Sequence, residues 1–90
     1  MSEGKNVFIT GASRGIGAAA ARLFARQGWG VGIGYHEAFK KAHALAEELR
    51  GLGVRAEIYP GDVSRRGEAR GVVDAFLREF GTLDVLVCNA

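Results

Sequence analysis

Residues 10–17 read Thr10-Gly11-Ala12-Ser13-Arg14-Gly15-Ile16-Gly17, and they connect an apolar segment at 6–10 to a segment with helical periodicity that begins at Ile16. The apolar segment is short and rich in β-branched residues, which predicts a buried strand. The first N–H groups of the following helix have no partner within the helix, and the helix dipole makes that end positive. Three glycines there leave the backbone open to an anion such as a diphosphate. A tight turn that only needs glycine is the alternative interpretation.

The rest of the chain repeats this alternation of strand and helix. Short apolar segments that predict strands lie at 6–10, 31–35, 55–59 and 83–88. Helical periodicity runs from 16 to a stop at Gly28, from 39 to 52, and from a predicted N-cap at Ser64 to a stop at Gly81. In the first helix the expected apolar face consists of Ile16, Ala19 or Ala20, Leu23 and Phe24. The order βαβαβαβ with short connections predicts an α/β fold, in which a parallel sheet carries helices on both faces.

Composition narrows the class of protein. The chain has 90 residues, 48% of them hydrophobic, so we expect one globular domain with a packed core. The chain has 12 Lys and Arg and 10 Asp and Glu, and the basic residues are scattered along the sequence. This pattern predicts neither binding to a nucleic acid nor binding to a membrane surface. No apolar stretch could span a bilayer, and residues 1–5 do not resemble a secretory signal. With a single cysteine, Cys88, no internal disulfide can form, and we expect a soluble, cytoplasmic protein.

The glycine loop resembles the cofactor loop of the classical short-chain dehydrogenase/reductase family. Its spacing is Gly-x-x-x-Gly-x-Gly, and two further motifs follow in register. Asp62-Val63 comes after the third predicted strand, and Cys88-Asn89-Ala90 comes after the fourth, where the family reads Asn-Asn-Ala-Gly. The closest resemblance is to the branch of 3-oxoacyl-carrier-protein reductases and glucose-dehydrogenase-like enzymes. Membership implies a Rossmann-type doubly wound parallel sheet with strand order 3-2-1-4, of which residues 1–90 form the first part and the C-terminal part is missing.

The resemblance also implies which residues bind the cofactor. The pyrophosphate and 2′-phosphate would be held by Gly11, Ser13, Arg14, Gly15, Ile16 and Gly17. Adenine would lie against Asp62 and Val63, and the nicotinamide ribose against Asn89 and Ala90. Asp62 is equally compatible with capping the third helix. The remaining cofactor-binding candidates, Tyr35 and His36, follow from the second strand. Gly32 and Gly34 share one face of that strand, where we expect the adenosine part to approach.

The end of the second strand bears on the choice of cofactor. NAD-selective enzymes place an acidic residue there to bind the ribose 2′-hydroxyl, whereas this chain has Tyr35 followed by His36. The first acid, Glu37, comes about two positions late and is expected in the opening turn of the helix. Arg14 carries a guanidinium group that suits a phosphate, although it could also be a solvated loop cation. The sequence therefore favours NADP over NAD.

The catalytic residues of the family are absent from residues 1–90. The family uses a Ser, and a Tyr followed by Lys at the fourth position, but Tyr35 and Tyr59 are followed there by Phe39 and Val63. No metal-ligand cluster stands in for them. The resemblance implies the N-terminal nucleotide-binding portion of a longer NADP-dependent oxidoreductase, inactive alone, whose complete form interconverts a small-molecule alcohol and carbonyl compound and forms homo-oligomers such as tetramers. The alternative is a non-catalytic dinucleotide-binding sensor or interaction module.

Overall fold

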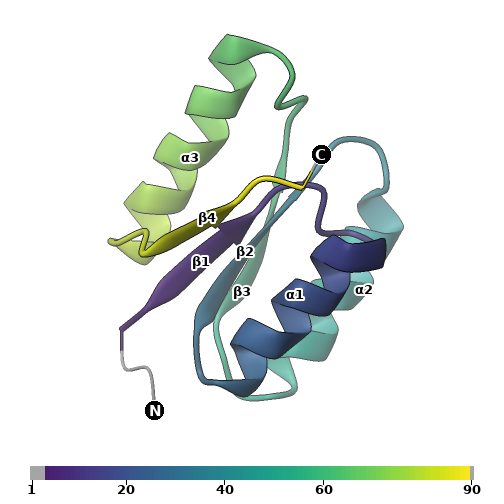
Figure 1. The fold of residues 1–90 in the computed structure, drawn as a ribbon, viewed down its shortest axis with the longest axis vertical. Helices are drawn as coiled ribbons and strands as arrows, with labels where there is room; N and C mark the ends of the chain where they lie inside the picture. The colour runs from purple at the N-terminus through teal and green to yellow at the C-terminus, as the bar shows by residue number, and fades with distance from the viewer. Residues whose placement is uncertain (1–3, 90) are drawn as a thin grey trace.

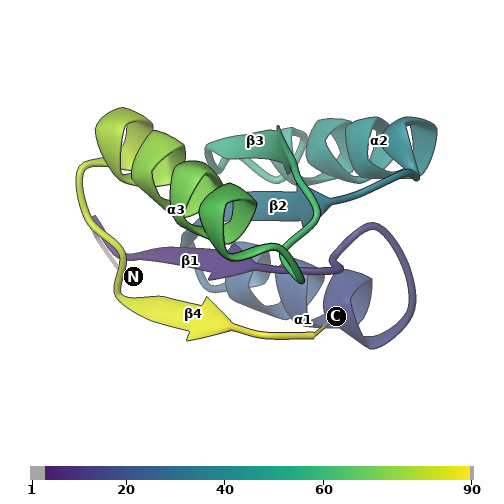
Figure 2. The ribbon, with the colours of Figure 1, turned by 90° about the horizontal axis from the view of Figure 1, so that it is seen from above.

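A computed structural model describes residues 4–89, and it consists of a parallel sheet flanked by helices (Figure 1). The strands are β1 (Asn6–Ile9), β2 (Gly30–Tyr35), β3 (Ala56–Pro60) and β4 (Val85–Val87). The helices are α1 (Gly15–Arg26), α2 (Phe39–Arg50) and α3 (Arg66–Phe80). The strand order is β3-β2-β1-β4, with every pair parallel, as Figure 2 shows from above. The predicted α/β fold and the order 3-2-1-4 are confirmed.

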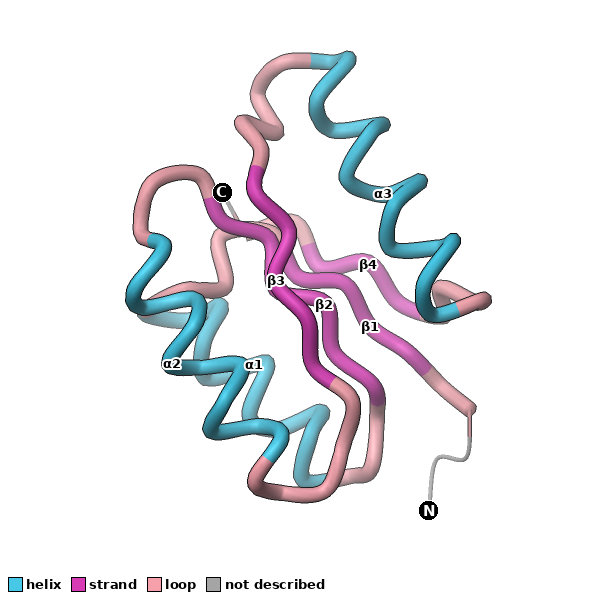
Figure 3. The backbone as a smooth tube through the Cα atoms, turned by 180° about the vertical axis from the view of Figure 1, so that it is seen from behind, coloured by secondary structure: helices cyan, strands magenta, loops and turns pink. Residues whose placement is uncertain are grey.

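The two faces of the sheet are covered by different helices. Helices α1 and α2 lie on one face and α3 lies on the other (Figure 3). Alternate residues of β1 point to opposite faces of the sheet. Val7 and Ile9 pack with α1 and α2, whereas Phe8 packs with α3. No helix within residues 4–89 is long and apolar enough to cross a membrane.

The predicted apolar face of α1 is wrong for Ile16 and Leu23, whereas Ala20 and Phe24 pack against the core as predicted. Ile16 is 80% exposed and Leu23 is 59% exposed. The helix instead buries its smallest residues, which are Gly17, Ala18, Ala21 and Ala25. Small side chains let the helix lie close to the sheet, and this close approach determines which face of α1 is turned inward. Cys88, which follows β4, is exposed.

The missing side chain of Gly32 makes room for aromatic packing beneath α3. A Cβ atom at Gly32 would lie 2.5 Å from Cδ1 of Phe76 and 2.7 Å from Cδ1 of Phe8. The ring centroids of Phe8 and Phe76 lie 5.3 Å apart. The ring centroid of Tyr59 lies 5.7 Å from that of Phe8 and 5.9 Å from that of Phe76. The group that approaches Gly32 is therefore α3 of the same chain and not a cofactor, which corrects the expectation for this residue.

This packing predicts the effect of adding one methyl group to β2. Gly32→Ala should lower the free energy of unfolding by about 1–3 kcal/mol, because the rings of Phe8 and Phe76 must move apart. In the matched control, Gly71→Ala in α3, the new Cβ meets nothing within 4 Å. That variant should be stabilised by up to about 1 kcal/mol, since alanine favours the helix. Urea denaturation measures both, and equal stabilities for the two variants would contradict this account of the core.

Candidate functional site

A large cleft in the described part of the chain lies where the strands end. It has a volume of about 710 Å³ and is bounded by the loop after β1, the loop after β2 and the segment after β4. Its lining residues are Gly11, Ser13, Arg14, Gly15, Ile16, Tyr35, His36, Glu37, Ala38 and Asn89. Strand β1 has β2 on one side and β4 on the other, so the chain reverses its direction of winding here. Ligands of open α/β sheets bind at such a switch point.

The glycine loop has the backbone conformation that its sequence predicts. Gly11 and Gly15 have φ angles of +61° and +63°, a region that L side chains rarely adopt. Gly17 is buried and does not line the cleft. A Cβ atom there would lie 2.5 Å from the carbonyl oxygen of Gly11 and 2.7 Å from Nδ2 of Asn89. Gly17 therefore packs against the loop on the side away from the cleft. The other predicted loop residues line the cleft, and these are Gly11, Ser13, Arg14, Gly15 and Ile16.

Asn89 joins the end of β4 to the glycine loop. Its backbone N–H donates a 2.9 Å hydrogen bond to Oγ1 of Thr10, and its side-chain amide donates to the carbonyl oxygen of Gly11 at 3.3 Å. The backbone N–H of Thr10 donates to the carbonyl oxygen of Val87 at 2.9 Å. Thr10 was not singled out from the sequence, although a polar residue at the end of a buried strand was the available signal. Ala90, the other residue predicted here, lies outside the described residues.

A smaller hollow of about 250 Å³ adjoins the cleft. Its lining residues are Gly11, Gly34, Tyr35, His36, Gly61, Asp62, Val63 and Ser64. Gly11, Tyr35 and His36 also line the cleft, so the two spaces are continuous at these residues. Asp62 and Val63, which follow β3, thus lie beside the residues at the end of β2. Together the two hollows form one continuous surface with a larger and a smaller compartment.

Asp62 closes a turn in front of α3. Its Oδ1 atom accepts hydrogen bonds from the backbone N–H of Ser64 at 3.0 Å and from the Ser64 hydroxyl. These bonds, followed by the positive charges of His36 and Arg65, lower the pKa of the Asp62 carboxyl. The prediction of Ser64 as N-cap is wrong, because the N-cap is Arg65 and it makes no side-chain cap. Ser64 is instead held in the turn by Asp62, two residues earlier.

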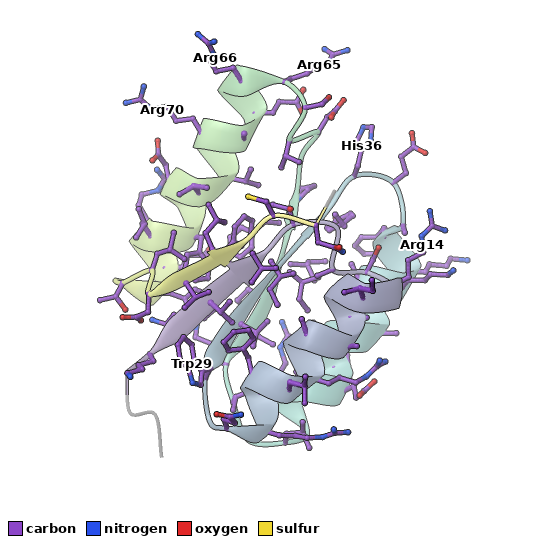
Figure 4. All side chains as sticks on the ribbon, viewed as in Figure 1. Arg14, Trp29, His36, Arg65, Arg66 and Arg70 are labelled. Carbon is purple, nitrogen blue, oxygen red and sulfur yellow. The ribbon has the colours of Figure 1, made fainter. Side chains whose placement is uncertain are left out.

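Basic side chains surround this end of the molecule. Figure 4 shows Arg14 and His36 on neighbouring loops, while Trp29 lies at the opposite end. Arg14 and His36 line the cleft and are exposed, so the guanidinium and the imidazole can reach a ligand. Arg65 and Arg66 lie at the start of α3, beyond the turn that Asp62 closes (Figure 4). The cleft therefore suits an anion.

Glu37 is a lining residue whose placement the sequence analysis predicted wrongly. It was expected in the first turn of the second helix, but α2 begins at Phe39 and Glu37 precedes it. The backbone N–H of Phe39 donates a 2.9 Å hydrogen bond to the carbonyl oxygen of Glu37, which bends the chain just before the helix. Glu37 consequently lies in the same cleft as Arg14 and His36.

The described residues contain no evident catalytic group. Tyr59 is buried under α3, where its hydroxyl donates to the Glu79 carboxylate, and burial raises its pKa. It does not line the cleft. No group of three or more His, Cys, Asp or Glu within residues 4–89 could hold a metal ion.

Comparison with known proteins agrees with this geometry. The family model described as short chain dehydrogenase matches residues 5–90. The chain belongs to the short-chain dehydrogenase family. It is 37% identical over 90 residues to the 3-oxoacyl-[acyl-carrier-protein] reductase FabG of Staphylococcus aureus, covering all of this chain and 37% of the relative. It is 42% identical over 90 residues to L-rhamnose 1-dehydrogenase (NAD(P)(+)) of a Sphingomonas species, covering all of this chain and 35% of the relative.

A solved structure supports the same assignment. The crystal structure of a blue fluorescent protein from a metagenomic library, in complex with NADPH, superposes with a TM-score of 0.92 and 39% identity. The match covers 97% of this chain and 36% of that protein. This short-chain dehydrogenase sequence thus spans about a third of the length of the curated relatives it matches.

The Asp62 turn leads to a prediction about pH. A carboxyl whose folded pKa lies below its unfolded value of about 3.9 stabilises the fold above that value and loses this contribution as pH falls through the folded pKa. Asp62→Asn should therefore be less stable than the wild type at neutral pH, and this deficit should shrink below about pH 4. Urea denaturation at the two pH values measures the difference. A deficit of equal size at both would contradict a stabilising role for the ionised carboxylate.

Proposed function

We propose that residues 1–90 form the nucleotide-binding portion of a single Rossmann-type domain in an NADP(H)-dependent oxidoreductase. The observation that carries the proposal is the placement of Arg14 and His36 in one cleft with the glycine loop, at the switch point of the sheet. The NADPH bound by the blue fluorescent protein and the NAD(P)(+) in the name of the rhamnose dehydrogenase support a nicotinamide dinucleotide. Within residues 4–89, neither Arg14 nor His36 forms an ion pair, so both charges are available.

The residues present fit this cofactor. Gly11 and Gly15 line the cleft without a side chain, so their backbone would accept the diphosphate at the start of α1. Arg14 and His36 would hold the 2′-phosphate by charge-assisted hydrogen bonds. Adenine would occupy the smaller hollow against Val63, with Asp62 at its edge.

The nicotinamide end would lie toward β4. Asn89 lines the cleft there and is fixed by its bonds to Thr10 and Gly11, so it would position the ribose next to the nicotinamide, with Ala90 beside it. Ser13 and Ile16 line the same cleft and would enclose the phosphates, while Gly17 supports the loop and Tyr35 bounds the adenosine ribose. The bound cofactor would supply the hydride that passes between an alcohol and a carbonyl group.

The catalytic Ser, Tyr and Lys of this proposal lie in sequence outside residues 1–90. The 90 residues by themselves would bind NADPH and reduce nothing, because the cleft contains no acid–base pair for the substrate carbonyl. The complete protein would act in the cytoplasm on a small-molecule substrate and assemble as a homo-oligomer, for which a tetramer is the natural candidate. Turnover of a carbonyl compound by residues 1–90 alone would contradict this division of roles.

Replacement of Arg14 tests the cofactor assignment. In the protein expressed at the full length of its reading frame, Arg14→Ala should weaken NADPH binding about tenfold, as expected for the loss of one hydrogen-bonded charge. The affinity for NADH should change by less than about twofold, since NADH lacks the 2′-phosphate that Arg14 would contact. Isothermal titration calorimetry measures both dissociation constants. Arg26→Ala is the control, because Arg26 lies in the last turn of α1 and outside the cleft.

The proposal fails if Arg14→Ala binds NADPH as tightly as the wild type. It also fails if the affinities for NADPH and NADH fall equally, because the Arg14 guanidinium would then not contact the 2′-phosphate.

A further inference from the structure

Three arginines lie together at the start of α3. They are Arg65, Arg66 and Arg70, all three are exposed, and Figure 4 shows their side chains extending away from the sheet. Nε of Arg65 lies 3.8 Å from carboxylate oxygens of Asp62 and of Glu68. In the part of the chain that the structure describes, no ion pair involves Arg66 or Arg70. The guanidinium groups of these two residues can therefore meet a partner.

The placement of the arginines is unfavourable for the helix itself. The first turn of a helix carries the positive end of the helix dipole, which repels cations. Arg65 is the N-cap of α3, and Arg66 is its first residue. Arg66 and Arg70 are four residues apart, a spacing that puts two like charges side by side on one face of the helix. Residues that break a local rule of stability are expected where a protein binds something, and this cluster breaks two such rules.

Two glycines leave the surface of α3 bare beside the arginines. Gly67 and Gly71 directly follow Arg66 and Arg70, and both glycines are exposed. A Cβ atom at either glycine would meet nothing within 4 Å, so no contact inside the chain requires a glycine there. A glycine within a helix also destabilises it relative to alanine. The bare strip lets a second helix approach closely, while acidic side chains of that helix reach the guanidinium groups.

The charges around the cluster favour a protein over a nucleic acid. Asp62 and Glu68 lie beside Arg65, and their carboxylates would repel a continuous phosphate backbone. The net charge of the chain is only +2, and its basic residues are scattered along the sequence. Carboxylates one turn apart on a helix, by contrast, match the spacing of Arg66 and Arg70.

We infer that the start of α3 is a docking surface for an acidic helix of a partner protein. Arg66 and Arg70 bind its carboxylates, and Gly67 and Gly71 allow its backbone to lie close to that of α3. This interaction goes beyond the proposed function, because the four residues lie outside the cleft and need no bound nucleotide.

A labelled peptide tests the role of the charges. The probe is an alanine-rich helical peptide with glutamate at every fourth position, and its fluorescence anisotropy is followed during titration with the protein expressed at the full length of its reading frame. Arg66→Gln/Arg70→Gln should bind the peptide about tenfold more weakly than the wild type, because two charge-assisted contacts are lost. Arg26→Gln/Arg78→Gln is the matched control, since it removes the same net charge from exposed residues in the last turns of α1 and α3. The control should change the affinity by less than about twofold.

Gly71→Ala tests the close approach of the two helices. The variant should bind the same peptide at least about threefold more weakly, although alanine strengthens α3, because the added methyl group holds the two backbones apart. An unchanged affinity would overturn the docking geometry.

Four results would overturn the inference as a whole. The first is no binding of the peptide to the wild type at millimolar concentrations, and the second is an equal loss of affinity in the two double variants. The third is unfolding of Arg66→Gln/Arg70→Gln at a lower urea concentration than the wild type, because the fold would then account for the arginines. The fourth is tighter binding of a single-stranded oligodeoxynucleotide of the same charge through Arg66 and Arg70, which would identify a nucleic acid as the partner.

Discussion

The structure depends on one close approach, between the start of α1 and the ends of β1 and β4. A Cβ atom at Gly17 would lie 2.5 Å from the Gly11 carbonyl oxygen and 2.7 Å from the Asn89 amide, so no other amino acid fits without displacing the loop or β4. Asn89 in turn binds Thr10 and Gly11. Because three segments far apart in sequence meet here, the contact that sets the helix on the sheet also shapes the cleft.

Much of the fold could be predicted from local pattern. Each strand is a short apolar run and each helix ends near a glycine, so the order of elements, and with it the parallel sheet, follow from the sequence. The face of α1 could not be predicted in this way. Ile16 and Leu23 are larger than the alanines, yet they remain exposed because the helix packs through its small residues. The distance between α1 and the sheet decides here which residues of the helix are buried, and the sequence does not reveal that distance.

The part of the site whose backbone conformation is set by the glycine motif could be predicted from the sequence. The part whose conformation is set by a short turn could not. The lining of the cleft by Gly11, Arg14 and His36 agrees with the motif, since the loops that carry them follow directly from strand ends. Glu37 was misplaced, because the turn that separates it from α2 is held by a single backbone bond. Glu37 stands two residues before the start of α2 and its carboxylate lies in the cleft, with direct consequences for the charge that a ligand meets.

The central claim is that the glycine loop at the switch point receives the diphosphate of a dinucleotide. Backbone amide chemical shifts of the isotope-labelled protein, followed by NMR during titration with NADPH, test it most directly. The account predicts that the largest changes fall on Gly11, Arg14 and Gly15, with smaller ones at His36 and in the smaller hollow. Changes centred on the opposite end of the sheet, or none at saturating NADPH, would contradict it.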